Sequence, residues 1–290
     1  MEPILELQGV TKKFPKFLLK DVSFTLKPGY IMGFIGANGA GKSTTIKLIM
    51  NLLRRDGGEI RVFGLDLLRH EHEIKNRIGF VYDENHFYEE LTIKEMKTII
   101  APFYQDWDDS VYKRLIKDFE LPENQKIKDL SKGMKMKFSL AIALSHHAEL
   151  LLMDEPTSGL DPLIRSDFLG ILSEVIQDEK CSVLFSTHIT SDLDRIADYI
   201  TLIHEGKILF SMGKDDLLES HALIKGEKSL LGPELSKYLV GYRENQFGFE
   251  GLVKNKEELQ PLLTGRAILE RPSLEDIMLY CTRGNAACSD

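Results

Sequence analysis

Long apolar segments are absent from this sequence of 290 residues. The longest uninterrupted ones, such as residues 141–144 and 150–153, are far shorter than the roughly 20 residues that a transmembrane helix needs. Residues 1–6 lack the basic and apolar regions of a secretory signal peptide, and no lipidation motif is present. We therefore expect a cytoplasmic chain that does not cross a membrane by itself.

Cysteines are few, and an excess of positive charge is missing. Cys181, Cys281 and Cys288 are odd in number and irregularly spaced, a pattern that fits neither a disulfide framework nor a zinc site. The formal net charge of -8 argues against a nucleic-acid partner held by a general basic surface. The sequence thus predicts reduced thiols and no nucleic-acid partner.

The distribution of apolar residues indicates an α/β protein with a helical insertion. Residues 30–35 form a continuous apolar segment, which is typical of a strand buried in a parallel sheet. From about residue 84 to 147 the periodicity is instead mainly helical. Other strands are predicted at 4–7, 22–26, 59–63, 77–82, 150–153, 183–186, 199–203 and 208–210, and helices at 93–104, 110–119 and 135–145.

The pattern changes again near Gly213. We expect a main unit over residues 1–213 and a small α+β module over residues 214–290. Ser273 and Asp276 resemble a capping box at the start of a helix. In this module, strands are predicted at 222–225, 247–253 and 267–269, and helices at 256–263 and 273–281.

A glycine-rich loop follows the apolar strand at 30–35. Residues 36–43 match the pattern G-x-x-x-x-G-K-[ST], and an amphipathic helical segment comes next. Gly36, Gly39 and Gly41 allow backbone N–H groups to turn toward phosphate oxygens, and Lys42 supplies a positive charge. Ser43 is a predicted ligand of Mg²⁺. The sequence therefore predicts a phosphate-binding loop, which also includes Asn38, Ala40 and Thr44.

Two adjacent carboxylates end the apolar strand at 150–153. A buried strand tolerates acids only at its exposed end, so Asp154 and Glu155 are expected at the carboxyl edge of the sheet, where α/β folds bind ligands. With a phosphate loop upstream, Asp154 would serve the Mg²⁺ site and Glu155 would polarise the attacking water. The alternative is an acidic turn that caps the next helix.

Two further motifs complete a family resemblance. Residues 130–134 read L-S-K-G-M, which resembles the signature L-S-G-G-Q, and residues 186–188 end in His188, which resembles a switch histidine. In this order the motifs of about residues 4–213 resemble the ATP-binding subunit of an ABC transporter. A P-loop kinase or a small GTPase would not show this series. The resemblance implies a P-loop NTPase core with an antiparallel β subdomain and a helical insertion.

The resemblance also implies a mechanism and roles for single residues. Two copies would meet head to tail, with ATP between the phosphate loop of one and the signature of the other. Ser131 and Gly133 would cap the γ-phosphate across the interface, while His188 would contact it from its own subunit. Asp161 would link the two sites at the dimer seam. Phe14, with Phe17 as its competitor, would stack on the adenine, and the alternative is an ordinary core phenylalanine.

The chain departs from the family pattern at two places. Asp83 stands where the family has a glutamine, and it is either a ligand of Mg²⁺ or its water, or a solvated loop acid. Lys132 and Met134 replace a glycine and the glutamine of the signature. The charge of Lys132 would either favour the bound triphosphate or accompany weaker closure. The histidines of residues 70–73 are better explained as a solvated helix face than as metal ligands.

These observations predict an ATPase that converts ATP and water to ADP and phosphate and powers a separate membrane permease. Its second nucleotide-binding domain would be an identical copy or a paralogue. Residues 272–277 resemble the closing segment of ABC-2-type exporters, which favours export. The resemblance places the chain on the inner face of the cell membrane, bound through its permease. The alternatives are a regulatory ATP-binding module with weak hydrolysis and a soluble ABC ATPase without a transport role.

Overall fold

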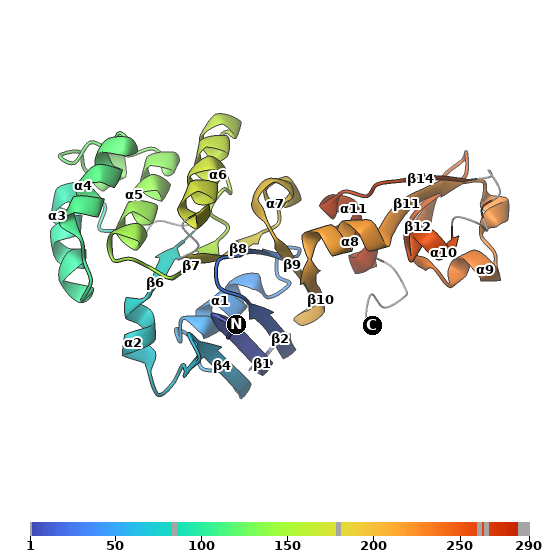
Figure 1. Ribbon diagram of the computed structural model, residues 1–290, viewed down its shortest axis with the longest axis horizontal. Coiled ribbons are helices and arrows are strands. Elements are labelled where there is room, and N and C mark those ends of the chain that lie inside the picture. Colours follow the sequence, from blue (N-terminus) through green and yellow to red (C-terminus); the bar gives the residue numbers. More distant parts are fainter. Residues whose placement is uncertain (1, 83–85, 178–180, 260–262, 264–266, 284–290) are drawn as a thin grey trace.

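The computed structural model describes residues 2–82, 86–177, 181–259, 263 and 267–283. Within these residues the strands form three sheets. In Figure 1 the first sheet lies beside the central one, and the third lies toward one end of the elongated molecule. The strand orders are β2-β1-β4-β5, β10-β9-β3-β8-β7-β6 and β12-β13-β11-β14. The predicted α/β architecture with an antiparallel β subdomain and a helical insertion is confirmed.

The first sheet is antiparallel and is built from the N-terminal third of the chain. Its strands are β1 (Leu5–Phe14), β2 (Phe17–Leu26), β4 (Gly57–Val62) and β5 (Leu65–Asp66). Buried and exposed residues alternate over much of β2, as expected for a strand with one face on a core. Both long strands extend further than the sequence pattern indicated, because their outer halves carry lysines and show little apolar alternation.

The central sheet consists mainly of parallel strands, whose carboxyl ends lie along one edge. β3 (Ile31–Ile35), β6 (Ile78–Val81), β7 (Leu150–Asp154), β8 (Ser182–Thr187) and β9 (Tyr199–His204) are connected through parallel pairs, and β10 (Lys207–Gly213) joins β9 in antiparallel orientation. All residues of β3 and β8 are buried, which explains the apolar runs at residues 31–35 and 183–185. The loops that follow β3, β7 and β8 therefore lie on one edge.

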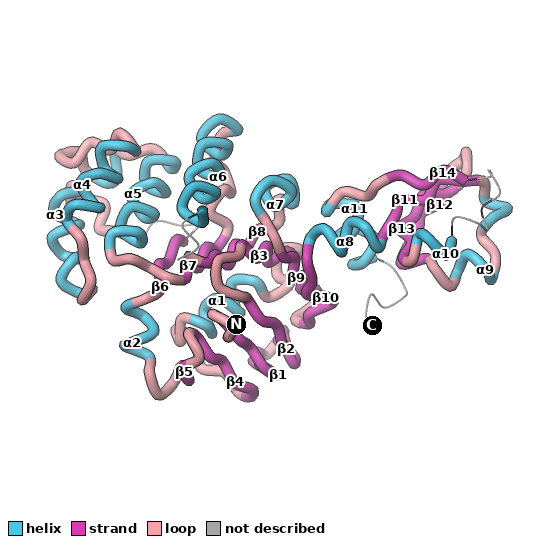
Figure 2. The backbone as a smooth tube through the Cα atoms, in the orientation of Figure 1, coloured by secondary structure: helices cyan, strands magenta, loops and turns pink. Residues whose placement is uncertain are grey.

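The helices fall into two groups: some pack near the central sheet, and the others form the helical insertion. Those near the sheet are α1 (Lys42–Ile49), α2 (Glu71–Asn76), α6 (Pro162–Gln177) and α7 (Thr190–Ile196). The insertion holds α3 (Ile93–Ile100), the 3-10 turns Ala101–Phe103 and Ile127–Asp129, α4 (Asp109–Asp118) and α5 (Lys132–Ser145). Figure 2 shows α3, α4 and α5 gathered at one end of the molecule.

Two predicted helices have different bounds in the structure. The helix expected over 93–104 is α-helical only to Ile100, and a 3-10 turn containing Pro102 follows, since proline has no N–H for the α-helical bond. The helix expected from residue 135 starts at Lys132, because the Ser131 side chain accepts a hydrogen bond from the Met134 N–H and caps it.

The third sheet belongs to the C-terminal part of the chain. It contains β11 (His221–Gly226), β12 (Leu239–Glu244), β13 (Phe249–Lys254) and β14 (Ala267–Glu270), and β12 was not predicted because its outer half is polar. The helices are α8 (Lys214–Ser220), α9 (Pro233–Ser236), α10 (Lys256–Leu259) and α11 (Leu274–Arg283), with a 3-10 turn at Lys228–Leu230. The capping box is confirmed: Asp276 accepts from the Ser273 N–H, and Ser273 Oγ accepts from the Asp276 N–H.

The C-terminal helix α11 packs into the core of the main unit. Leu274, Ile277 and Tyr280 belong to the same buried cluster as Leu193 and Ile196 of α7. A separate cluster fills the other face of the third sheet, between the sheet and the short helices α9 and α10. Cys181 and Cys281 are buried, whereas Cys288 lies outside the described residues. None of the helices in the described ranges combines the length and apolarity needed to cross a membrane.

Candidate functional site

The loop after β3 has the backbone shape that a phosphate-binding loop needs. Gly39 and Gly41 have φ values of 81° and 118°, a region that strongly favours glycine. A side chain at Gly36 would collide with the carbonyl oxygen of Ile203 on the neighbouring strand. Sequence and backbone therefore agree that all three positions require glycine.

The loop leads directly into the N-terminus of α1. Lys42, Ser43 and Thr44 form its first turn, where backbone N–H groups have no partner within the helix. Asn38 is exposed, whereas Ala40 is buried and its N–H bonds to Ala37 O at 3.0 Å. Free N–H groups at the positive end of a helix dipole suit an anion such as a phosphate group.

The Lys42 side chain connects this loop to the carboxylates after β7. Its ammonium group, on a side chain only 5% exposed, donates to Gly36 O at 2.7 Å and lies 3.1 Å from Glu155 Oε1. A buried ammonium is costly unless it is paired, and Glu155 supplies the opposite charge. The structure thus brings Lys42 and Glu155, which lie far apart in sequence, into direct contact.

Glu155 also contacts His188 at the end of the neighbouring strand. Its Oε2 lies 2.8 Å from His188 Nδ1 and 3.3 Å from the His188 N–H. The Glu155 backbone has φ of 50°, unusual for a non-glycine residue, and its N–H donates to Ser186 O at 3.0 Å. Lys42, Glu155 and His188 therefore form one chain of charged and polar contacts at the carboxyl edge of the sheet.

Asp154 ends β7 and is held by β8. Ser186 Oγ donates to Asp154 Oδ1 at 2.8 Å. Burial, together with the nearby Asp154 carboxylate, raises the pKa of the Tyr82 hydroxyl. Helix α1, which carries the predicted ligand Ser43 in its first turn, contacts β7. Asp83 lies outside the described residues.

The residues present fit Mg²⁺ as a partner of bound phosphates. The described residues contain no group of three or more His, Cys, Asp or Glu side chains that could hold a metal ion. Mg²⁺ commonly uses one or two protein oxygens, waters and substrate phosphates, so a serine hydroxyl and one carboxylate are a suitable donor set. His70 and His72, in turn, are exposed, as the sequence indicated.

Ser131 and Gly133 lie at the start of α5 in the helical insertion. Ser131 caps α5, and Gly133 is buried against α6, where an added Cβ would lie 2.5 Å from Ile164 Cγ2. Lys132 points toward the turn after β7: a Cβ at Gly159 would lie 3.5 Å from its Nζ. The contacts described for Ser131 and Gly133 are thus with α5 and α6, whereas the loop after β3 contacts β9 and the helix α1 that follows it contacts β7.

Asp161 has a local structural role at the start of α6. Its Oδ1 accepts hydrogen bonds from the N–H groups of Leu163 and Ile164, both at 3.1 Å. This is the contact of an N-cap residue, and it leaves the exposed side of Asp161 at the surface. The acid that caps α6 is thus Asp161. Glu155, for which the sequence left a capping role open, instead contacts Lys42 and His188.

Phe14 and Phe17 lie side by side at the tip of the β1–β2 hairpin. They are paired across the hairpin, and their ring centroids are 6.2 Å apart. Phe17 is nearer to the phosphate loop, since a Cβ at Gly41 would lie 3.1 Å from its ring. Lys12 lies 5.8 Å from the centroid of Phe14. Both rings are partly exposed beside the loop.

Sequence reasoning missed a buried carboxylate next to this site. Asp192, on α7, is 1% exposed and accepts a hydrogen bond from Thr157 Oγ1 at 2.6 Å. It also forms an ion pair with Arg165 of α6. The available signal was the polarity of Asp192 at a position that the helical pattern places beside Leu193 and Ile196.

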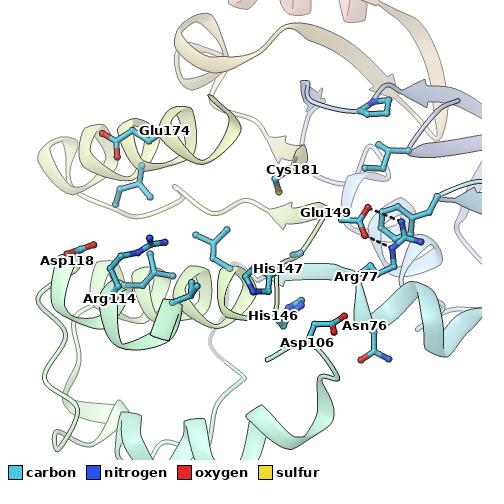
Figure 3. A pocket seen from close by; sticks show the side chains of 18 of the residues that line it. Asn76, Arg77, Asp106, Arg114, Asp118, His146, His147, Glu149, Glu174 and Cys181 are labelled. Atoms are coloured by element: carbon cyan, nitrogen blue, oxygen red, sulfur yellow. Dashed lines mark hydrogen bonds and ion pairs between the residues drawn. The ribbon is translucent and has the colours of Figure 1, made fainter. Parts of the chain in front are cut away.

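A hollow lies at the amino edge of the central sheet, opposite to the edge that carries Lys42, Glu155 and His188 (Figure 3). It has a volume of about 1370 Å³ and is lined by residues that precede β6, β7 and β8, including Arg77, Glu149 and Cys181. Arg77 and Glu149 form a bidentate ion pair, in which Nε and Nη2 of Arg77 donate to the two carboxylate oxygens of Glu149 at 2.6 and 2.9 Å. Burial raises the pKa of the Cys181 thiol to about 12, so it stays protonated at neutral pH. This hollow is separate from the Lys42–Glu155–His188 chain.

Comparisons with known proteins agree on one family. The family model described as ABC transporter matches residues 19–158. The ABC transporter ATP-binding protein YtrB of Bacillus subtilis (strain 168) is 30% identical over 223 residues, which cover 77% of this chain and 76% of that protein. The bacitracin transport ATP-binding protein BcrA of Bacillus licheniformis is 32% identical over 220 residues, covering 75% and 72%. A solved structure, an ATP-binding subunit of an ABC transporter, matches with a TM-score of 0.68 and 30% identity over 74% of this chain and 92% of that chain.

Proposed function

Because the chain belongs to the ATP-binding subunits of ABC transporters, we propose that it hydrolyses ATP at the carboxyl edge of its central sheet to power a separate membrane permease. ATP binding and ATP hydrolysis coupled to transport are the activity of this family. The observation that carries the proposal for this site is the chain of contacts from Lys42 through Glu155 to His188.

Each of these residues has a role that follows from its position. Lys42 would bind the terminal phosphates, since its ammonium group lies inside the phosphate loop. Glu155 would accept a proton from the attacking water, and His188, bonded to the same carboxylate, would orient it and contact the γ-phosphate. Mg²⁺ held by Ser43 and Asp154, with Asp83 as a further ligand, would neutralise charge on the phosphates.

A second copy of the domain would complete the site. Ser131 and Gly133 sit at the N-terminus of a 14-residue helix, which favours anions, and their contacts are with α5 and α6. Their predicted function of capping the γ-phosphate would thus be performed on the ATP of a partner domain, identical or paralogous, with Asp161 at the seam. The phosphate-loop residues, with Phe14 against the adenine, would hold ATP from the first copy.

We propose a domain organisation, a location and a direction of transport that fit a permease partner. We propose an ATPase domain over residues 1–213, with its helical subdomain at about 84–147, and an accessory module over 214–290. The chain would act at the inner face of the cell membrane and be held there by its permease. Export is the favoured direction, and the relative named for bacitracin transport makes an antibiotic or peptide cargo a reasonable first choice.

The outer face of the helical subdomain offers a surface for this permease. Ile99 and Phe103 are four residues apart at the end of α3 and its 3-10 turn, and they are 42% and 74% exposed. Apolar side chains spaced by four lie on one side of a helix, and exposed apolar surface marks a binding site. We propose that this face docks on the permease.

Aspartate at these two positions tests the docking surface. We expect Ile99→Asp with Phe103→Asp to release the chain from the membrane fraction of its own cells by about tenfold or more, because charges would be buried in the interface. Ile268→Asp is the matched control, since Ile268 is 65% exposed on β14. Equal retention of the double variant and the control would contradict the proposed surface.

The substitution Glu155→Gln tests the catalytic proposal. It removes the proton acceptor and keeps the shape, so ATP hydrolysis should fall by roughly 100-fold or more while ATP binding persists. An ATP-bound dimer should then accumulate on gel filtration. Glu59→Gln, on the exposed face of β4, is the control and should hydrolyse normally.

Two outcomes would decide against this proposal. Full activity of Glu155→Gln would remove Glu155 from its assigned role. Absence of hydrolysis by the wild-type chain at high concentration, with and without its permease, would instead favour the regulatory ATP-binding module.

A further inference from the structure

In addition to the Glu155–His188 contact, a buried hydrogen bond joins the β7–α6 turn to helix α7. Thr157 Oγ1 donates to Asp192 Oδ2 at 2.6 Å, and both side chains are 1% exposed. The Arg165 guanidinium, from the first turns of α6, pairs with the other oxygen of Asp192 and donates to Ser191 Oγ at 2.9 Å. One buried carboxylate thus joins the turn, α6 and α7.

The spacing of these residues links them to the proposed catalytic pair. Thr157 follows Glu155 by two residues, and Asp192 follows His188 by four and lies in the first turn of α7. Glu155 and His188 meet at 2.8 Å only while the two segments that carry them keep their relative position. The Thr157–Asp192 bond holds these same two segments together.

The electrostatics of Asp192 indicate that it fixes the relative position of the segments it joins and that it adds little to the stability of the fold. A buried carboxylate is costly to desolvate, and even a well-paired ion pair in the interior contributes little net stability over an apolar replacement. Both carboxylate oxygens of Asp192 nevertheless accept a hydrogen bond, one from Thr157 and one from Arg165. Such a polar network fixes the relative orientation of the segments that it joins.

We propose that Asp192 is a positioning residue for ATP hydrolysis: through Thr157 and Arg165 it keeps His188 aligned with Glu155. This inference rests on the proposed roles of Glu155 and His188. Asp192 does not touch ATP in this scheme; it acts on the geometry of two residues that do.

Conservative substitutions at both ends of the bond test the inference in the full-length chain. Asp192→Asn should lower kcat by about 10- to 100-fold, since small misplacements of catalytic groups have effects of this size. Thr157→Val, which keeps the shape and loses the hydroxyl, should lower kcat about tenfold, and Thr157→Ser should retain it within about twofold. The affinity for the fluorescent analogue MANT-ATP should change less than about threefold in every variant.

The double variant tests whether the two residues act through one bond. Thr157→Val with Asp192→Asn should reduce kcat no further than the stronger single substitution, because both remove the same interaction. Arg195→Ala is the matched control. Its guanidinium donates to Ser166 Oγ at 3.1 Å, a bond that also joins α7 to α6 but is exposed, and its loss should leave kcat unchanged.

The outcomes separate this inference from the proposed function. If Glu155→Gln abolishes hydrolysis while Thr157→Val and Asp192→Asn turn over like Arg195→Ala, the positioning role is wrong. A loss of kcat that tracks the melting temperature and disappears on cooling would show a stabilising residue and overturn it as well. If Asp192→Asn does not fold, the valine and serine variants of Thr157 decide. Full activity of Glu155→Gln would instead contradict the role that the proposed function gives to Glu155.

Discussion

At the residue scale, the glycines of the two nucleotide motifs are required for different reasons. Gly41 of the phosphate loop has φ of 118°, which a side chain would strain. Gly133 of the signature is helical, and its constraint is the side chain of Ile164 on α6. The first glycine is therefore required by the conformation of the backbone, whereas the second allows two helices to approach closely.

This difference predicts the effect of Gly133→Ala. Alanine keeps the backbone N–H, so any contact of this group with a phosphate survives, but the methyl group would lie 2.5 Å from Ile164 Cγ2. We expect a loss of unfolding free energy of about 1–3 kcal/mol by denaturant titration. Adding Ile164→Ala should restore part of it, because the clash is removed. A double variant as unstable as the sum of the two single ones would refute the packing explanation.

At the element scale, α5 joins the signature at its N-terminus to a buried histidine at its C-terminus. His146 is 2% exposed, caps α5 and stacks on Tyr104 with ring centroids 3.8 Å apart. Burial lowers the pKa of His146 to about 4. In the unfolded chain a histidine titrates near about 6.5.

The stability of this region should therefore fall in mildly acidic solution. Between pH 6.5 and about 4 the unfolded chain binds a proton that folded His146 does not bind, so stability present above pH 6.5 is lost as the pH falls toward 4. Replacing His146 by Phe should make the drop in unfolding free energy from pH 7 to pH 5 smaller by about 2 kcal/mol. The control is His147→Gln at the exposed neighbour. An unchanged drop in His146→Phe would contradict the prediction.

At the scale of the whole molecule, α7 lies between the candidate ATP site and the C-terminal sheet. Its first residues follow His188, its Asp192 bonds to the turn after Glu155, and its Leu193 and Ile196 share a buried cluster with Leu274 and Ile277 of α11. Figure 1 shows α7 and α11 on the same flank of the molecule. A change in the packing of α11 can thus affect the candidate ATP site through its contacts with α7.

Truncation of Ile277 tests this route. Ile277→Ala should destabilise the chain by about 2–5 kcal/mol and increase amide hydrogen exchange in residues 190–196, because the cavity lies in the shared cluster. Leu259→Ala creates a comparable cavity in the separate cluster of the third sheet and should leave exchange in 190–196 unchanged. Equal effects of the two variants on 190–196 would mean that α11 does not transmit its packing to α7.

Much of this protein was readable from local sequence patterns. The phosphate loop, the strand that ends in Asp154 and Glu155, and the helical insertion are encoded in short segments, because apolar periodicity and glycine placement act over a few neighbours. The ends of β1, β2 and α3 and the existence of β12 were missed. The polar strand residues are held by hydrogen bonds to partner strands, and the end of α3 depends on Pro102, which has no N–H to donate. Apolar periodicity carries no information on either effect.

The sequence by itself determined the family, the α/β architecture and the set of candidate ATP-binding residues. Only the tertiary structure decided that Lys42, Glu155 and His188 form one chain of contacts, that Gly133 packs on Ile164, and that buried Asp192 ties Thr157 to Arg165. The physical reason is that these contacts join segments many residues apart. Their distances depend on how β3, β7 and β8 align in one sheet and how α6 and α7 pack beside it.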